Sequence, residues 1–177
     1  MQFIALLRGV TPTGKNRIPS MAYLAEILTD AGFRNVRTYI QSGNILLNTD
    51  FSKDETALMI RGTILRKIGA DLSVILKTRE QLAAAVAENP FCEGYDISRI
   101  HLTFTNDPAD ADKLRKIEEA DFGCEKFFSG SECFYLYLPL GVRNRTLYSG
   151  YLEKHLDRTS TTRKLSVVMR LAELARR

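Results

Sequence analysis

The 177-residue sequence contains no tryptophan, only two histidines and only three cysteines. Cys92, Cys124 and Cys133 are widely spaced and form no Cys-x-x-Cys pair, so they predict neither a disulfide framework nor a thiolate metal site. With His101 and His155 as the only histidines, we expect no zinc site, and the sequence indicates no metal or other cofactor. Isolated cysteines of this kind are typical of small buried side chains, and they give little support to nucleophilic catalysis.

Long apolar runs are also missing. The stretch Leu82–Ala87 is among the longest, and it falls far short of the roughly 20 residues that cross a bilayer. The first residues lack a cationic segment followed by an apolar core of signal-peptide length. Because 45% of the residues are hydrophobic, a packed core is expected. We therefore predict a soluble, cytoplasmic protein without membrane contact.

Neither sign of charge is in large excess. The chain has 25 Lys and Arg against 21 Asp and Glu, a formal net charge of +4, which permits anionic partners without requiring them. The basic residues gather in four segments: Arg8–Arg17, Arg34–Arg37, Arg143–Arg145 and Arg158–Lys164. No pair of carboxylates is spaced as a general acid and base, so the sequence gives no support for an enzyme.

The first half of the chain alternates between strand and helix patterns. The predicted elements are a strand at 2–8, a helix at 20–31 that Gly32 ends, hairpin strands at 34–40 and 45–48, a helix at 53–69 and a strand at 72–77. In the first hairpin arm, Val36, Thr38 and Ile40 are expected on one face, and residues 41–44 form the turn. This order, β-α-β-β-α-β, is that of a ferredoxin-like plait.

The second half repeats this order less completely. The predicted elements are a helix at 78–89, a strand at 99–105, a helix at 109–119, hairpin strands at 123–129 and 132–139, and helices at 142–156 and 162–176. We therefore predict an α+β protein of two consecutive ferredoxin-like (α/β plait) units with antiparallel sheets and C-terminal helices. The expected units are residues 1–78 and 79–177, without a low-complexity linker between them.

The loop Gly9–Pro19 nearly matches a phosphate-binding loop, because Gly14 and Lys15 follow Gly9 at the right spacing. Asn16 stands where that motif needs a serine or threonine to bind magnesium, and Arg17, Ile18 and Pro19 separate this part of the loop from the helix. The loop therefore predicts no Walker-type nucleotide hydrolysis. Cations before a helix N-terminus favour a weaker anion site, and the alternative is a long turn with solvated cations.

The plait topology brings a second polar segment to this loop. The first and third strands of a plait are adjacent and antiparallel, so Gly9 and Asn44 are expected at the same edge. We predict a polar cleft, formed by the Gly9–Arg17 loop and the Gln41–Asn44 turn, for a small anionic, phosphate-bearing ligand. Its expected lining is Lys15, Asn16, Arg17, Gln41, Ser42 and Asn44. The alternative is that residues 41–44 are polar only because turns favour such residues.

A second basic segment, Arg158–Lys164, is predicted to begin the last helix. Arg163 and Lys164 then lie in its first turn, where they oppose the helix dipole unless an anion binds there. The alternative is that they are surface cations whose aliphatic stems cover apolar surface.

Together these segments resemble the family called domain of unknown function 1697, whose members are bacterial α/β-plait proteins of unassigned activity. The resemblance covers nearly the whole chain and is carried by LLRGVTPTGKNRI, NVRTYIQSGNILL, ENPF, LYLPLG and TTRK. It directs attention to Arg8, Gly9, Gly14, Lys15, Asn16, Tyr39, Gln41, Ser42, Gly43, Asn44, Thr162 and Arg163. The predicted ligand-binding set is Arg8, Gly14, Lys15, Asn16, Arg17, Gln41, Ser42, Asn44, Thr162 and Arg163, with no metal ligand.

The chain departs from that family in two places. Many members carry Asn-Val-Gly-Gly in place of Thr11–Gly14, and Asn-Trp-Asn-Thr in place of Lys164–Val167. If the second group contributes to a family site, this protein has lost part of it.

Two further classes of function remain open. A nucleic-acid-binding module would stack bases on Tyr135 and Tyr137 of the second hairpin, although the third strand offers no aromatic pair. A regulatory or assembly protein without catalysis would pair through sheet edges or its final helix, in an oligomeric state that the sequence does not predict. Strong salt dependence of binding would favour nucleic acid over a small ligand.

Overall fold

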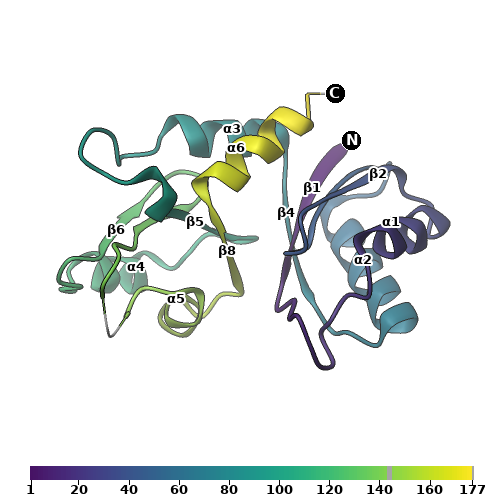
Figure 1. Ribbon diagram of the computed structural model, residues 1–177, viewed down its shortest axis with the longest axis horizontal. Helices are drawn as coiled ribbons and strands as arrows, with labels where there is room; N and C mark the ends of the chain where they lie inside the picture. The colour runs from purple at the N-terminus through teal and green to yellow at the C-terminus, as the bar shows by residue number, and fades with distance from the viewer. Residues whose placement is uncertain (143–144, 177) are drawn as a thin grey trace. The chain divides into compact units, whose positions relative to one another are not determined.

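The computed structural model describes residues 1–142 and 145–176 (Figure 1). The chain divides into two compact units, Met1–Arg79 with the extreme C-terminus, and Glu80–Leu174. Each unit contains one four-stranded antiparallel sheet built from a β-α-β-β-α-β order of elements. The prediction of an α+β fold with two consecutive plait units is therefore confirmed.

The first unit has the elements that the sequence predicted. They are β1 (Gln2–Arg8), α1 (Met21–Asp30), β2 (Arg34–Tyr39), β3 (Asn44–Asn48), α2 (Lys53–Ile68) and β4 (Ser73–Lys77). The strand order is β2-β3-β1-β4, and β1 pairs antiparallel with both of its neighbours. Leu6 lies opposite Asn44, so the carboxyl end of β1 lies beside the amino end of β3, as the topology predicted.

Helix caps and a one-sided apolar pattern explain why the two helices form where they do. Ser20 accepts a hydrogen bond from the backbone N–H of Tyr23 at the start of α1. Ser52 and Glu55 form a capping box at the start of α2, and Gly69 ends that helix in the left-handed region. Both helices pack with one face of the sheet in a core that includes Phe3, Ala5, Leu7, Leu24, Leu28, Ile45, Leu47, Ile60, Ile64, Val74 and Leu76.

The second unit is a complete plait, not the partial repeat expected from the sequence. Its elements are α3 (Arg79–Ala87), the short 3-10 helix η1 (Ile97–Arg99), β5 (Ile100–Thr105), α4 (Ala111–Glu118), β6 (Lys126–Ser129), β7 (Phe134–Tyr137), α5 (Ser149–Leu156), β8 (Ser160–Lys164) and α6 (Leu165–Leu174). The strand order is β6-β7-β5-β8, which matches the order in the first unit. A core of residues such as Ile117, Phe134, Leu136, Leu147 and Leu152 lies between this sheet and its helices.

The prediction that Arg158–Lys164 begins the last helix is wrong. Ser160–Lys164 forms strand β8, which pairs antiparallel with β5 and completes the sheet. The β-branched residues Thr161 and Thr162 favour this extended conformation. Helix α6 begins only at Leu165, so Arg163 and Lys164 do not lie in a first helical turn.

The helix predicted at 142–156 is also too long. Helix α5 begins at Ser149, and residues 145–148 precede it as an irregular segment. Arg143 and Asn144, which fell within the predicted helix, lie outside the described residues. No helix in the described part of the chain has the length and apolar character needed to cross a membrane.

Candidate functional site

The Gly9–Pro19 loop is fixed at both ends by apolar side chains. Val10 packs against the core of the first unit, and Ile18 is only 1% exposed. Between them the N–H of Thr11 donates to the carbonyl of Asn16 at 3.2 Å, and the N–H of Arg17 donates to the carbonyl of Gly14 at 3.2 Å. The exposed middle of the loop is therefore held in a closed turn between the partly buried Val10 and the buried Ile18.

The second segment of the site is the turn between β2 and β3. Ile40 has a φ of 50° and is exposed, so the chain leaves the strand there. The prediction that Ile40 shares a strand face with Val36 and Thr38 is therefore wrong. Gly43 has a φ of 76°, and its carbonyl accepts a hydrogen bond from the N–H of Leu7 at 2.8 Å. The turn thus lies directly against the end of β1.

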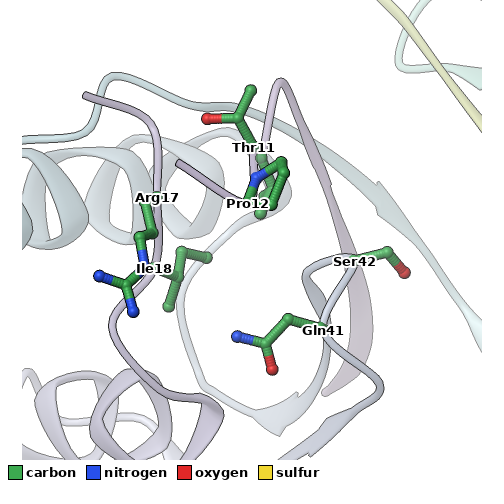
Figure 2. Close-up of a pocket in the computed structure, with 7 residues that line it drawn as sticks. Thr11, Pro12, Arg17, Ile18, Gln41 and Ser42 are labelled. Carbon is green, nitrogen blue, oxygen red and sulfur yellow. The ribbon is translucent and has the colours of Figure 1, made fainter. Parts of the chain in front are cut away.

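A cleft of about 420 Å³ opens between this loop and this turn (Figure 2). Its lining residues are Val10, Thr11, Pro12, Arg17, Ile18, Gln41 and Ser42. Figure 2 shows Arg17 and Gln41 on either side of Ile18, whereas the hydroxyl of Ser42 points away from both. The cleft therefore combines a guanidinium and an amide with an apolar wall.

Three residues predicted from the sequence, Arg17, Gln41 and Ser42, line this cleft. Asn44 instead lies beneath the turn and is fully buried. Its side-chain amide donates to the carbonyl of Tyr39 at 2.9 Å and to the hydroxyl of Ser42 at 3.0 Å. Asn44 therefore shapes the turn that presents Gln41 and Ser42.

Lys15 is not among the lining residues and lies near Asp71. The guanidinium of Arg61 donates to Asp71 at 2.6 and 2.9 Å. This hydrogen-bonded pair lowers the pKa of Asp71, and the charge of Lys15 lowers that pKa further. The charge of Lys15 therefore acts on a carboxylate that is not among the lining residues of the cleft.

The other predicted residues of this segment are not among the lining residues of the cleft. A Cβ placed on Gly9 would lie 3.6 Å from the side-chain amide nitrogen of Asn16, so Asn16 lies beside Gly9. Gly14 has a φ of 81° and forms the tight part of the loop. Arg8 ends β1, opposite Ser73 of β4.

Thr162 and Arg163, the remaining predicted residues, lie on β8 in the second unit. The hydroxyl of Thr162 lies 2.8 Å from that of Thr103 on β5. Arg163 is 8% exposed and donates to the hydroxyl of Thr161 and the carbonyl of Thr162. Burial lowers the pKa of Arg163 to about 10, so the side chain stays charged at neutral pH. These contacts hold both side chains against the sheet of the second unit.

Sequence reasoning missed the apolar part of the cleft, which consists of Val10, Pro12 and Ile18. The predicted site consisted only of charged, polar and glycine residues, so it did not include these positions. The available signal was an apolar residue at each end of an otherwise polar loop, because such residues anchor a loop against the core.

The aromatic platform that would support nucleic-acid binding is not open in this structure. Tyr135 is 1% exposed and donates its hydroxyl hydrogen to the carbonyl of Ala85 at 2.7 Å. Tyr137 packs against Phe91 and Tyr95, with ring centroids 5.8 and 4.8 Å apart. These rings stabilise the second unit, and nucleic-acid binding stays a prediction.

Within residues 1–142 and 145–176, no group of three or more His, Cys, Asp or Glu side chains is arranged to hold a metal ion.

Comparison with known proteins identifies the family of this chain and a solved structure with a similar fold. The family described as "Protein of unknown function (DUF1697)" matches residues 1–135. The solved structure of the conserved bacterial protein SP0830 from Streptococcus pneumoniae is similar, with a TM-score of 0.74 and 21% sequence identity over 99% of this chain and 98% of that chain. No curated protein matches this chain. At this identity, the structural likeness shows a shared fold alone.

Proposed function

We propose that this chain, which belongs to the DUF1697 family, binds a small phosphate-bearing metabolite in the cleft between the Gly9–Pro19 loop and the turn after β2. The observation that carries the proposal is that Arg17 and Gln41 face one cleft from two segments far apart in the sequence. The family description names no activity, so the proposal rests on these residues.

The charge of Arg17 supports an anionic ligand. Within the described part of the chain, no carboxylate forms an ion pair with this guanidinium. An arginine presents a planar fork of donors that matches the oxygens of a phosphate group. Arg17 is exposed, so a ligand reaches it without a rearrangement of the core.

The rest of the cleft supports an organic ligand over a bare ion. Its volume of about 420 Å³ lies in the range of small-molecule sites. Val10, Pro12 and Ile18 offer an apolar wall for the body of the ligand, and the amide of Gln41 donates and accepts hydrogen bonds. The proposal includes binding and no reaction.

An Arg17→Ala variant should bind the ligand roughly tenfold more weakly, because it loses a charge-assisted hydrogen bond. The measurement is the unfolding temperature with inorganic phosphate, pyrophosphate, nucleotides and sugar phosphates, each at low and high salt. A ligand at 100 times its dissociation constant adds about 2.7 kcal/mol to the stability of the parent protein. The same ligand should stabilise Arg17→Ala clearly less.

Lys15→Ala is the matched control, because it removes the same charge from the same loop at a residue outside the cleft lining. Its affinity should stay within about twofold of the parent value, since exposed charges away from a ligand are screened. Equal losses in both variants would show that only the general charge of the loop matters. A panel that shifts nothing in the parent protein would overturn the proposal.

A further inference from the structure

A group of positive side chains gathers at one end of the sheet in the second unit. His101 on β5 lies directly opposite Lys164 on β8 in the antiparallel register. Arg99 ends the 3-10 helix immediately before β5, and Arg145 belongs to the segment that precedes α5. Lys164 and Arg145 are exposed, and the other two side chains are half-buried, so the group is open to solvent.

Hydrogen bonds to the backbone fix two members of this group. The Nε of Arg99 donates to the carbonyl of Leu138 at 2.9 Å, and the N–H of Leu138 donates to the carbonyl of Arg99 at 3.0 Å. The Nδ1 of His101 lies 3.0 Å from that same Arg99 carbonyl. Because a carbonyl only accepts, Nδ1 carries the hydrogen, and neutral His101 keeps its Nε2 as an acceptor.

Burial and the nearby positive charges lower the pKa of His101. Burial lowers the pKa of His101 below its usual value, and the charges of Lys164, Arg99 and Arg145 lower it further, against the opposite effect of its hydrogen bond to Arg99. Among the described residues, no carboxylate forms an ion pair with Arg99, Arg145 or Lys164. The like charges therefore repel one another, and a bound anion would reduce that repulsion.

We propose that Arg99, His101 and Lys164 form a second anion site, in the second unit, that binds a phosphate group. An arginine and a lysine provide donors from which phosphate oxygens accept hydrogen bonds. The phosphate can belong to a free polyphosphate or to the backbone of a nucleic acid, since both present the same charged oxygens. This site shares no residue with the cleft of the first unit and does not depend on the function proposed for that cleft.

The experiment follows the His101 imidazole protons by NMR during pH titrations with and without pyrophosphate. The chain has only two histidines, and a His155→Gln variant leaves the His101 signal alone for assignment. A bound anion should raise the pKa of His101 by about one unit, because a nearby negative charge favours the protonated ring. In the parent chain, the imidazole signals of His155 at a fixed pH should not respond to pyrophosphate. An unchanged His101 pKa at saturating pyrophosphate overturns the proposal.

Lys164→Ala tests the site directly, and Lys154→Ala on α5 is the matched control with the same loss of charge. We expect roughly tenfold weaker pyrophosphate binding in Lys164→Ala and no such loss in Lys154→Ala. Equal losses in both would mean diffuse charge attraction and would overturn the site. The Arg17→Ala variant should keep the full response of His101, which separates this site from the cleft.

A short single-stranded oligonucleotide distinguishes the two sources of phosphate. Tighter binding of the oligonucleotide than of pyrophosphate, with affinity that falls steeply with salt, would support a nucleic-acid backbone as the ligand. Tighter binding of pyrophosphate, with a Lys164→Ala loss, would support a free polyphosphate.

Discussion

A Gly43→Ala variant is expected to lose about 3 kcal/mol of unfolding free energy, from left-handed backbone strain together with overpacking. Gly43 has a φ of 76°, a conformation that side chains with a Cβ rarely adopt. An added Cβ would lie 2.8 Å from the Cβ of Leu7 and 3.0 Å from Cγ2 of Val10. Leu7 lies on β1 and Val10 lies on the loop that follows it. Neither residue can move away from the turn without a shift of the carboxyl end of β1.

The same substitution should also impair the cleft. Val10 lines the cleft, and the turn around Gly43 presents Gln41 and Ser42 to it. Separating the turn from β1 therefore moves both walls. Calorimetry should show an unfolding temperature lower by about 10 °C, and the stabilising effect of any cleft ligand should fall in the same variant.

Gly14→Ala provides the control for this prediction. Gly14 also has a positive φ, of 81°, but no heavy atom lies within 4 Å of an added Cβ. This variant should lose only the backbone cost of about 1 kcal/mol. If Gly14→Ala and Gly43→Ala lost the same free energy of unfolding, the close approach of the turn to β1 would not contribute to the loss in Gly43→Ala.

The sequence predicted the first unit well because its signals are local. Ser20 and Ser52 mark the starts of the helices, Gly69 marks the end of one, and the apolar spacing marks the buried faces. The β-α-β-β-α-β order places β1 beside β3, so the pairing of these strands follows from the topology. The end of the sheet where the cleft lies, at the carboxyl end of β1, was therefore predictable.

The lining of the cleft was predictable only in part. Composition indicates that a loop is basic, but backbone hydrogen bonds decide which side chains turn inward. Arg17 follows the closed turn at Gly14 and lines the cleft, whereas Lys15 lies outside it. No pattern of charges in the sequence distinguishes these two cations.

The sequence did not predict strand β8, because helix α6 follows it directly without a loop. Ser160, Thr161 and Thr162 are residue types that favour helix N-caps, so the sequence predicts a helix start at Thr162. The useful signals were the two β-branched threonines and the turn before them, where Asp157 adopts a φ of 52° and ends α5. Pairing with β5 over five residue pairs then favours the strand.

A Glu125→Ala variant is expected to lose about 3 kcal/mol of unfolding free energy, because it leaves two backbone donors, one of them buried, without a partner. Glu125 is 3% exposed, and its Oε2 accepts from the N–H groups of Thr146 and Leu147 at 2.9 and 3.0 Å. Leu147 is fully buried in the core of the second unit, and Arg145 lies just before it. Chemical denaturation should show the loss, and the response of His101 to pyrophosphate should weaken as well.

Glu125→Gln separates the accepting oxygen from the negative charge. The amide keeps an oxygen that can accept from both N–H groups, and it removes a buried charge whose Oε1 has no hydrogen-bond partner among the described residues. We expect a loss of only about 1 kcal/mol, because neutral hydrogen bonds are weaker than charge-assisted ones. A loss as large as in Glu125→Ala would show that the charge itself holds the segment. The carboxylate would then act on the segment that carries Arg145 as a counter-ion, and the repulsion among the cations around His101 would be partly balanced from within the protein.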